Sequence, residues 1–152
     1  MPRLINAAHS FVEQHGRPSF HVYGAANEGN NRFGDWQTIV TNIGGCMQRV
    51  TPSGSYQRSR FTAPVNGAYH FGFWNIGKNS STISRHYVYK NGSSIGTGEM
   101  RVPTTSVHGW GSKQNVLELV AGDYVEFYAY NDLGNFGWYQ SVYSGCWGFL
   151  IS

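Results

Sequence analysis

The sequence predicts an all-β domain, built as a sandwich or barrel of eight or more short strands. Apolar and polar residues alternate in short runs from Pro18 onward, which is the period-two pattern of strands. Gly, Asn, Asp and Pro separate these runs, and no stretch after Pro18 has the spacing of an amphipathic helix. A chain of 152 residues is about the length of one domain.

Residues 1–16 differ from the rest and are predicted to form a leader with a weak helical pattern. Its periodic residues, at intervals of three and four, are Leu4, Ala8, Phe11 and His15. Gly16 and Pro18 end the pattern. The leader could pack on its own domain or dock to a larger assembly, for which the candidate residues are Leu4, Ile5, Phe11 and Val12. The expected division is therefore a leader, residues 1–16, and a β-domain, residues 17–152.

The first part of the domain predicts strands at residues 19–25, 36–42 and 56–62. The polar stretch 27–35 between the first two strands is predicted to be a loop. Its Asn, Glu and Asp oxygens could ligate a hard cation, but their spacing does not fit the twelve-residue calcium loop. A plain loop is the simpler interpretation, and no metal site is predicted.

The domain is organised around a strand that follows Pro64 and begins at Gly67. Its alternate sets are Tyr69, Phe71 and Phe73 on one face and Ala68, His70, Gly72 and Trp74 on the other. Both faces carry aromatic side chains, whereas a half-solvated strand should be polar on one face. We therefore expect another copy of the chain to cover this sheet.

The remaining predicted strands are residues 82–89, 93–102, 116–120, 124–131 and 143–151. Asn91-Gly92 lies between the first two of them and is a strong hairpin signal, because both residues accept positive φ. Gly122-Asp123 turns the chain in the same way further on.

Ring side chains on two further predicted loops, residues 103–111 and 131–140, are candidates for ligand binding. They are His108, Trp110, Phe136, Trp138 and Tyr139. Aromatic residues on loops of a rigid β-scaffold commonly contact a sugar ring or a protein, so a glycan or protein of a host surface is an expected partner. The alternative is that these rings cap the ends of the barrel or fill a trimer axis.

The sequence does not predict an enzyme. It shows no nucleophile beside a base, no paired carboxylates and no His or Cys cluster with metal-ligand spacing, so no cofactor is expected. A formal net charge of +3 without a basic arm gives no nucleic-acid site. No apolar run has the length of a membrane span or a signal peptide, which also disfavours secretion and makes Asn79 and Asn91 chance glycosylation motifs. Cys46 and Cys146 could pair, although buried thiols are the simpler expectation.

Four segments resemble the globular head domain of the first complement component. They are Phe61-Thr-Ala-Pro-Val-Asn-Gly67-Ala-Tyr69-His-Phe71, Asn91-Gly92, Leu117-Glu-Leu119-Val-Ala-Gly122-Asp123-Tyr-Val125 and Cys146-Trp-Gly148-Phe-Leu150. The match covers residues 17–152; it departs from the family at Cys146, where the family has Phe, and no collagen stalk precedes it. The resemblance implies a jelly-roll sandwich of about ten antiparallel strands, shared with tumour necrosis factor, that forms homotrimers around aromatic faces.

A trimer interface is expected from the doubled aromatic faces and from this resemblance. Its predicted residues are Tyr69, Phe71, Trp74, Tyr87, Tyr128 and Tyr130. The function expected is a non-enzymatic homotrimer on a virion surface, as a bacteriophage capsid decoration or fibre-head module that stabilises the particle or binds the host. Its leader would dock to a capsid or tail protein. The alternative is a secreted, extracellular complement-like recognition domain or lectin.

Overall fold

The computed structural model describes residues 10–27, 32–51, 57–78, 83–101, 108–131 and 144–152. Within these ranges, the side chains of residues 25–27, 32–33, 75–78, 83–84, 97–101, 108–110 and 129–131 are outside the description. The described residues form ten strands, and their bounds are β1 (Ser19–Asn27), β2 (Arg32–Ile43), β3 (Met47–Val50), β4 (Arg58–Thr62), β5 (Gly67–Lys78), β6 (Ile83–Lys90), β7 (Ser93–Arg101), β8 (His108–Leu119), β9 (Tyr124–Asn131) and β10 (Gly145–Leu150).

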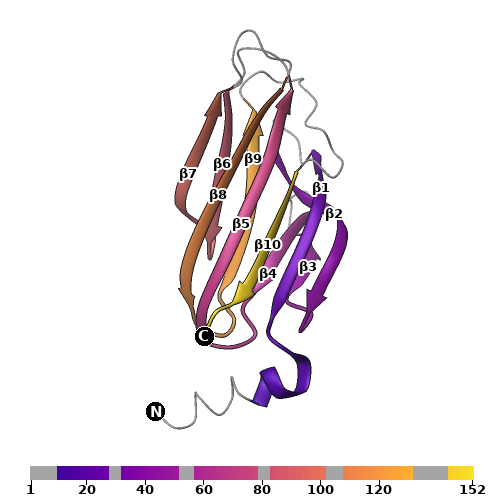
Figure 1. Ribbon diagram of the computed structural model, residues 1–152, viewed down its shortest axis with the longest axis vertical. Coiled ribbons are helices and arrows are strands. Elements are labelled where there is room, and N and C mark those ends of the chain that lie inside the picture. The colour runs from indigo at the N-terminus through magenta and orange to yellow at the C-terminus, as the bar shows by residue number, and fades with distance from the viewer. Residues whose placement is uncertain (1–9, 28–31, 52–56, 79–82, 102–107, 132–143) are drawn as a thin grey trace.

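The strands form two layers packed face to face (Figure 1). The front layer has the order β2-β1-β10-β5-β8, and the layer behind it has the order β3-β4-β9-β6-β7. β2 joins the layers, because Arg32 and Phe33 also pair with β9. Every pairing is antiparallel. This arrangement is the jelly-roll sandwich expected from the sequence.

The core lies between the layers and is filled by alternate residues of each strand, as a period of two requires. On β5 the inward set is Tyr69, Phe71 and Phe73, with exposed fractions of 0%, 0% and 2%. Phe61 of β4 meets this set from the opposite layer, with its ring centroid 5.1 Å from that of Phe71. Each buried aromatic ring of this kind contributes about 1.5–3 kcal/mol through removal from water.

Three strands differ from the sequence prediction. β2 begins at Arg32 and not at residue 36, so the second half of the stretch expected to be a loop, 27–35, is a strand. β3 was not predicted, because its four residues carry a single buried side chain, Met47. β8 begins at His108 and not at residue 116, and pairs with β5 along its whole length. Its first half contains Gly109, Gly111 and polar residues, so it has no apolar alternation. The long ladder with β5 makes it a strand where local propensity does not.

Residues 10–15 form a short helical segment, closed by a hydrogen bond from the Gly16 N–H to the Val12 carbonyl at 2.9 Å. Phe11 and Val12 pack against the core of the domain. The Phe11 ring lies over Gly44, where an added Cβ would come within 2.9 Å of it. These two predicted docking residues therefore contact their own domain, while Leu4 and Ile5 lie outside the described residues.

Two turns at one end of the sandwich are hydrogen bonded to each other. Asn91 adopts a φ of 49°, which confirms the predicted hairpin turn. Its side-chain Nδ2 donates to Asp123 Oδ1 at 2.8 Å, and Lys90 Nζ lies 3.0 Å from Asp123 Oδ2. The Val120 N–H also donates to Asp123, at 3.1 Å. These contacts lower the pKa of the Asp123 carboxyl from 3.8 to about 2, the Asn91 hydrogen bond being the largest cause.

Both cysteines are buried thiols, as the simpler sequence expectation had it. Burial raises the pKa of the Cys46 thiol to about 11 and raises that of Cys146 well above its usual value. Both groups are therefore protonated and unreactive at neutral pH.

Candidate functional site

The outward side of the front layer carries a continuous set of aromatic side chains, which we call the outer aromatic face. Because Phe20, Val22 and the β5 set above point into the core, the intervening residues of the same strands point outward. The rings of this face are His21, Tyr23, His70, Trp74, Trp147 and Phe149. The face extends over β1, β10 and β5, with β8 completing it on one side.

Strand register orders this face into rows. One row, which we call the apolar row, runs across five strands through Ile43, Ser19, Phe149, His70 and Val116. Three of its side chains are large, apolar and exposed: Ile43 at 41%, Phe149 at 40% and Val116 at 60%. Isolated exposed apolar residues are ordinary, but a row across a whole sheet indicates a contact surface.

The next two rows hold the two tryptophans. In one of them Trp147 is paired with Gly72, and in the other Gly145 is paired with Trp74. A Cβ on Gly72 would collide with the Trp147 indole, and a Cβ on Gly145 would collide with the Trp74 indole. Each indole therefore occupies the space above a glycine of the neighbouring strand.

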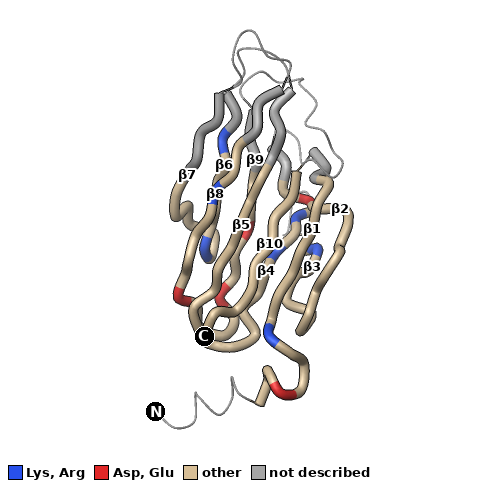
Figure 2. The backbone as a smooth tube through the Cα atoms, in the orientation of Figure 1, with Lys and Arg blue, Asp and Glu red and all other residues tan. Residues whose placement is uncertain are grey.

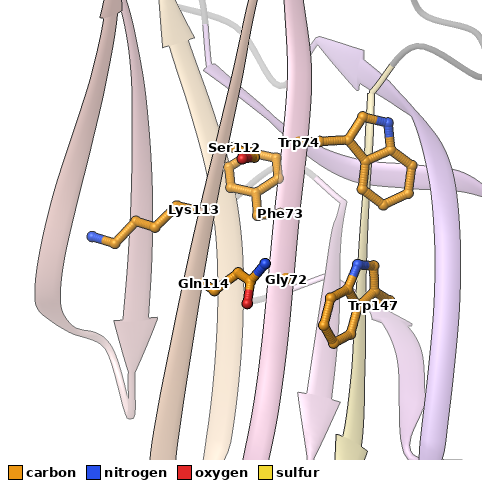
Figure 3. Close-up of a pocket in the computed structure, with 7 residues that line it drawn as sticks. All are labelled: Gly72, Phe73, Trp74, Ser112, Lys113, Gln114 and Trp147. Atoms are coloured by element: carbon orange, nitrogen blue, oxygen red, sulfur yellow. The ribbon is translucent and has the colours of Figure 1, made fainter.

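A groove lies beside these two indoles, and we call it the Trp groove. It has a volume of about 440 Å³ and is lined by Gly72, Phe73, Trp74, Ser112, Lys113, Gln114 and Trp147. Figure 3 shows both indole rings with their flat faces toward the viewer. In the same view the Gln114 side chain reaches toward Gly72, whereas Lys113 points away, toward the strands of the other layer.

The rings of the face hold one another in place. Trp147 stacks on Phe149 with centroids 5.8 Å apart and an angle of 12° between the planes. His70 meets Trp147 edge-on at 5.1 Å, and its Nε2 lies 3.0 Å from the Gln114 Oε1. His21 lies 5.6 Å from Trp74. These contacts fix the ring orientations before any partner binds.

The outer aromatic face has little charge. Among its described side chains on β1, β5, β8 and β10, Glu118 is the one carboxylate, and it lies at the end of β8 beyond the apolar row. None of them is a lysine or arginine, since Lys113 points to the other layer. A surface of this composition suits neutral or apolar partners.

The other layer is built differently, with charged side chains that are paired within the chain. Figure 2 marks the positions of the charged residues along the backbone. Glu126 is 3% exposed, and it accepts hydrogen bonds from Arg60 at 2.8 Å and from the Tyr128 hydroxyl at 2.8 Å. The Arg60 guanidinium also lies over the Tyr124 ring, 3.9 Å from its centroid. This network stabilises the sheet and leaves Glu126 unavailable for chemistry.

The hard-cation alternative for the 27–35 stretch does not hold at Asp35. This carboxylate is 6% exposed and paired with Arg49, whose Nη2 lies 2.6 Å from Asp35 Oδ2. Of the residues before it, Asn27 ends β1, 32–34 belong to β2, and 28–31 lie outside the described part of the chain.

The predicted trimer-interface residues divide into three groups. Tyr69, Phe71 and Tyr128 are at most 1% exposed in a single chain, so assigning them to a subunit contact was wrong. Trp74 belongs to the outer aromatic face, and Tyr87 is half-buried on the other layer. The side chain of Tyr130 lies outside the described residues.

The sequence interpretation missed the other rings of the outer aromatic face. The signal was present in Cys146-Trp147-Gly148-Phe149-Leu150, where two rings alternate with residues of the core. His108 and Trp110, expected in a loop, lie in β8, and their side chains are not described. Phe136, Trp138 and Tyr139 fall outside the described residues.

Buried titratable side chains are the groups that a catalytic or metal site would use. Within the described ranges, no three His, Cys, Asp or Glu side chains come together as a metal site. His86 is 2% exposed and packs 4.8 Å from the Phe73 ring, and burial followed by repulsion from Lys113 lowers its pKa to about 4. It is therefore a neutral core residue at physiological pH. A search of the described helical residues finds no segment able to cross a bilayer.

Comparison with known proteins defines the class of fold. No protein-family model matches the chain, and no curated protein matches its sequence. Crystal structures of murine APRIL at pH 5.0, 8.5 and 8.0 do match, with TM-scores of 0.65, 0.60 and 0.62 and identities of 14%, 14% and 13%. Each alignment covers 88% of this chain and 98% of the APRIL chain. The chain thus has the tumour necrosis factor-like jelly roll, and at such identities the likeness shows the fold alone.

Proposed function

We propose that this protein is a non-enzymatic module that assembles as a homotrimer through the apolar row of its outer aromatic face. The observation that carries the proposal is the exposure of Ile43, Phe149 and Val116 in one row of a domain whose own core is complete. A second copy would remove these side chains from water at a gain of about 25 cal/mol per Å².

A threefold contact needs two different patches, because each subunit meets its neighbours through unlike surfaces. The apolar row supplies one patch. Ile39 and Val40 of β2, at the flank of the front layer, are 48% and 54% exposed and supply a second. The resemblance to the complement head domain supports three copies, and a standard interface buries about 800 Å² on each partner.

The setting we propose for the trimer is the surface of a virus particle, where it stabilises the shell or contacts the host. Closed assemblies of short strands protect their sheet edges, which suits a module exposed to proteases. Docking through the leader would use Leu4 and Ile5, since Phe11 and Val12 pack on the domain. Electron microscopy of particles lacking the protein tests this setting, and unchanged surface density would contradict it.

A secreted recognition domain is the second candidate, and the tumour necrosis factor-like fold favours it. An export signal encoded upstream of this chain in the source gene would support secretion and would argue against a virion protein.

Assembly is tested by sedimentation velocity at low micromolar concentration. We expect wild type to sediment as a trimer and Val116→Lys as a monomer, because three lysine ammonium groups would be buried without partners. Ile95→Lys on β7 is the matched control: it replaces another exposed β-branched residue, 39% exposed, away from the apolar row, and should remain trimeric. A monomeric wild type, or equal behaviour of the two variants, would refute the proposal.

A further inference from the structure

The apolar row contains one side chain of a type that changes its charge close to neutral pH, His70. It lies in the row between Phe149 and Val116, which are 40% and 60% exposed and belong to the proposed subunit contact. An imidazole in water takes up a proton at about pH 6.5. We propose that His70 makes assembly of the homotrimer pH-dependent, with trimers at neutral pH and separate folded subunits in mildly acidic solution. This inference rests on the proposed function, because it concerns the same contact.

The His70 ring is held by uncharged neighbours. It meets Trp147 and Phe149 edge-on, at centroid distances of 5.1 Å and 5.5 Å. Its Nε2 lies 3.0 Å from Gln114 Oε1, to which the neutral tautomer with a proton on Nε2 donates. Nδ1 makes no hydrogen bond to any residue that the structure describes. Protonation would therefore place a second N–H in the contact without an acceptor.

Within the described part of the chain, no carboxylate is paired with His70. On β8, Glu118 lies two residues beyond Val116, whereas the His70 Nε2 contacts Gln114 on the opposite side of Val116. The ammonium group of Lys113 is directed toward the other layer (Figure 3). A proton on His70 would therefore stay unpaired within its own subunit.

The other strands near His70 do not supply a counter-charge either. On β1, His21 is a second imidazole, one row away in the row of Trp147. On β5, the Ala68 N–H donates at 3.0 Å to the main-chain oxygen of Ser152, the last residue of the chain. The β2 patch of the neighbouring subunit, Ile39 and Val40, has no titratable side chain. A charge on His70 would thus be buried against apolar side chains in the trimer.

Assembly and protonation of His70 therefore oppose each other. Removal of an imidazolium from water costs free energy that the neutral ring does not cost. Below about pH 6.5 each free subunit carries the proton and must release it to assemble, so that a trimer releases up to three. One pH unit lower, this weakens assembly about tenfold for each site and about 10³-fold in all. The contact is fully stable above about pH 6.5 and is lost as pH falls below that value.

Folding also depends on pH in this range, through His86. Burial lowers the pKa of this core ring to about 4. Unfolded chains therefore bind a proton between about pH 6.5 and pH 4 that folded chains do not bind, and folding becomes weaker as pH falls. This effect acts on each subunit alone, so circular dichroism separates it from loss of the subunit contact.

The test is sedimentation equilibrium of the intact chain at a series of pH values from about 7.5 to about 5.5, on both sides of the imidazole range. We expect the trimerisation constant to fall by up to about 10³-fold, with uptake of up to three protons for each trimer that dissociates. Circular dichroism of the same samples should show folded chains throughout. Dissociation that coincides with loss of the β-sheet signal would assign the pH dependence to folding and would overturn the proposal.

His70→Gln removes the titrating ring and keeps a polar side chain beside Gln114. It should remain trimeric over the whole pH series, because nothing at this position takes up a proton. His70→Phe is a second variant of the same kind, with an apolar ring in place of the imidazole, and should behave alike. His15→Gln is the matched control, since His15 is exposed and lies outside the apolar row in the segment 10–15. It should dissociate in acid as wild type does.

The outcomes separate this inference from the proposed function. A wild-type trimer with the same trimerisation constant across the pH series would overturn the role of His70 and leave the trimer standing. Equal acid dissociation of wild type and both His70 variants would also overturn that role, because another group would then sense pH. A wild type that is monomeric at the neutral end of the series would overturn the trimer, and the role of His70 with it.

Discussion

Replacing Phe71 with alanine should remove a large share of the free energy of unfolding of this protein. Phe71 is 0% exposed. Three rings surround it, with centroids at 5.1 Å for Phe61, 5.5 Å for Phe127 and 6.2 Å for Phe20. Truncation would leave a cavity among these rings, and Phe→Ala changes of this kind cost about 3–5 kcal/mol. Since a domain is stable by about 5–15 kcal/mol, this loss is a large share of the total.

The assay is urea unfolding followed by circular dichroism. With a denaturant slope of about 2 kcal/mol per M, the midpoint should fall by about 2 M. The unfolding curves with and without Phe71→Ala should both be measured in the Val116→Lys background, because the apparent stability of an oligomer depends on protein concentration. Phe149→Ala, which removes the same side chain from a position that is 40% exposed, is the matched control and should change the unfolding free energy by less than about 1.5 kcal/mol. A loss below about 1 kcal/mol for Phe71→Ala, or equal losses for both variants, would refute the placement of Phe71 in the core.

Two further predictions concern a carboxylate and a glycine. The folded pKa of Asp123 is lowered to about 2, so its stabilising effect is complete above the unfolded value near 3.8 and is lost as pH falls from about 4 through 2. In Asp123→Asn, the melting temperature should depend less on pH between about 4 and 2. An unchanged pH dependence would contradict the hydrogen-bond network with Asn91. Gly72→Ala should destabilise the protein, because the new methyl group and the Trp147 indole would occupy the same space. In thermal melts the double variant with Trp147→Ala should lose less stability than the sum of the single variants; strict additivity would show that the two residues do not collide.

The positions of most strands along the chain could be predicted from the sequence. The turns at Asn91-Gly92 and Gly122-Asp123 were predicted from the conformations their residues accept, and both have positive φ at glycine in the structure. The short strand β3 and the first half of β8 were not predicted, because pairing with distant strands makes them extended where their own residues give no alternation.

The candidate site was predicted less well. Doubled aromatic faces on the strand beginning at Gly67 were read correctly, but Tyr69 and Phe71 were assigned to a subunit contact and lie in the core. Trp147 and Phe149 lie 73 and 75 residues after Trp74 in the sequence. They join it only because β10 pairs with β5.

The sequence by itself determined that the chain is a β-sandwich, where most of its strands lie and which residues share a strand face. These properties follow from period-two alternation and turn chemistry, which are local to the chain. Only the tertiary structure decided which of the two alternate sets faces inward and which rings from distant strands become neighbours. Alternation alone does not say which of the two faces is buried. The other layer of the sandwich decides this, because it covers one face and leaves Trp74 and Trp147 on the other.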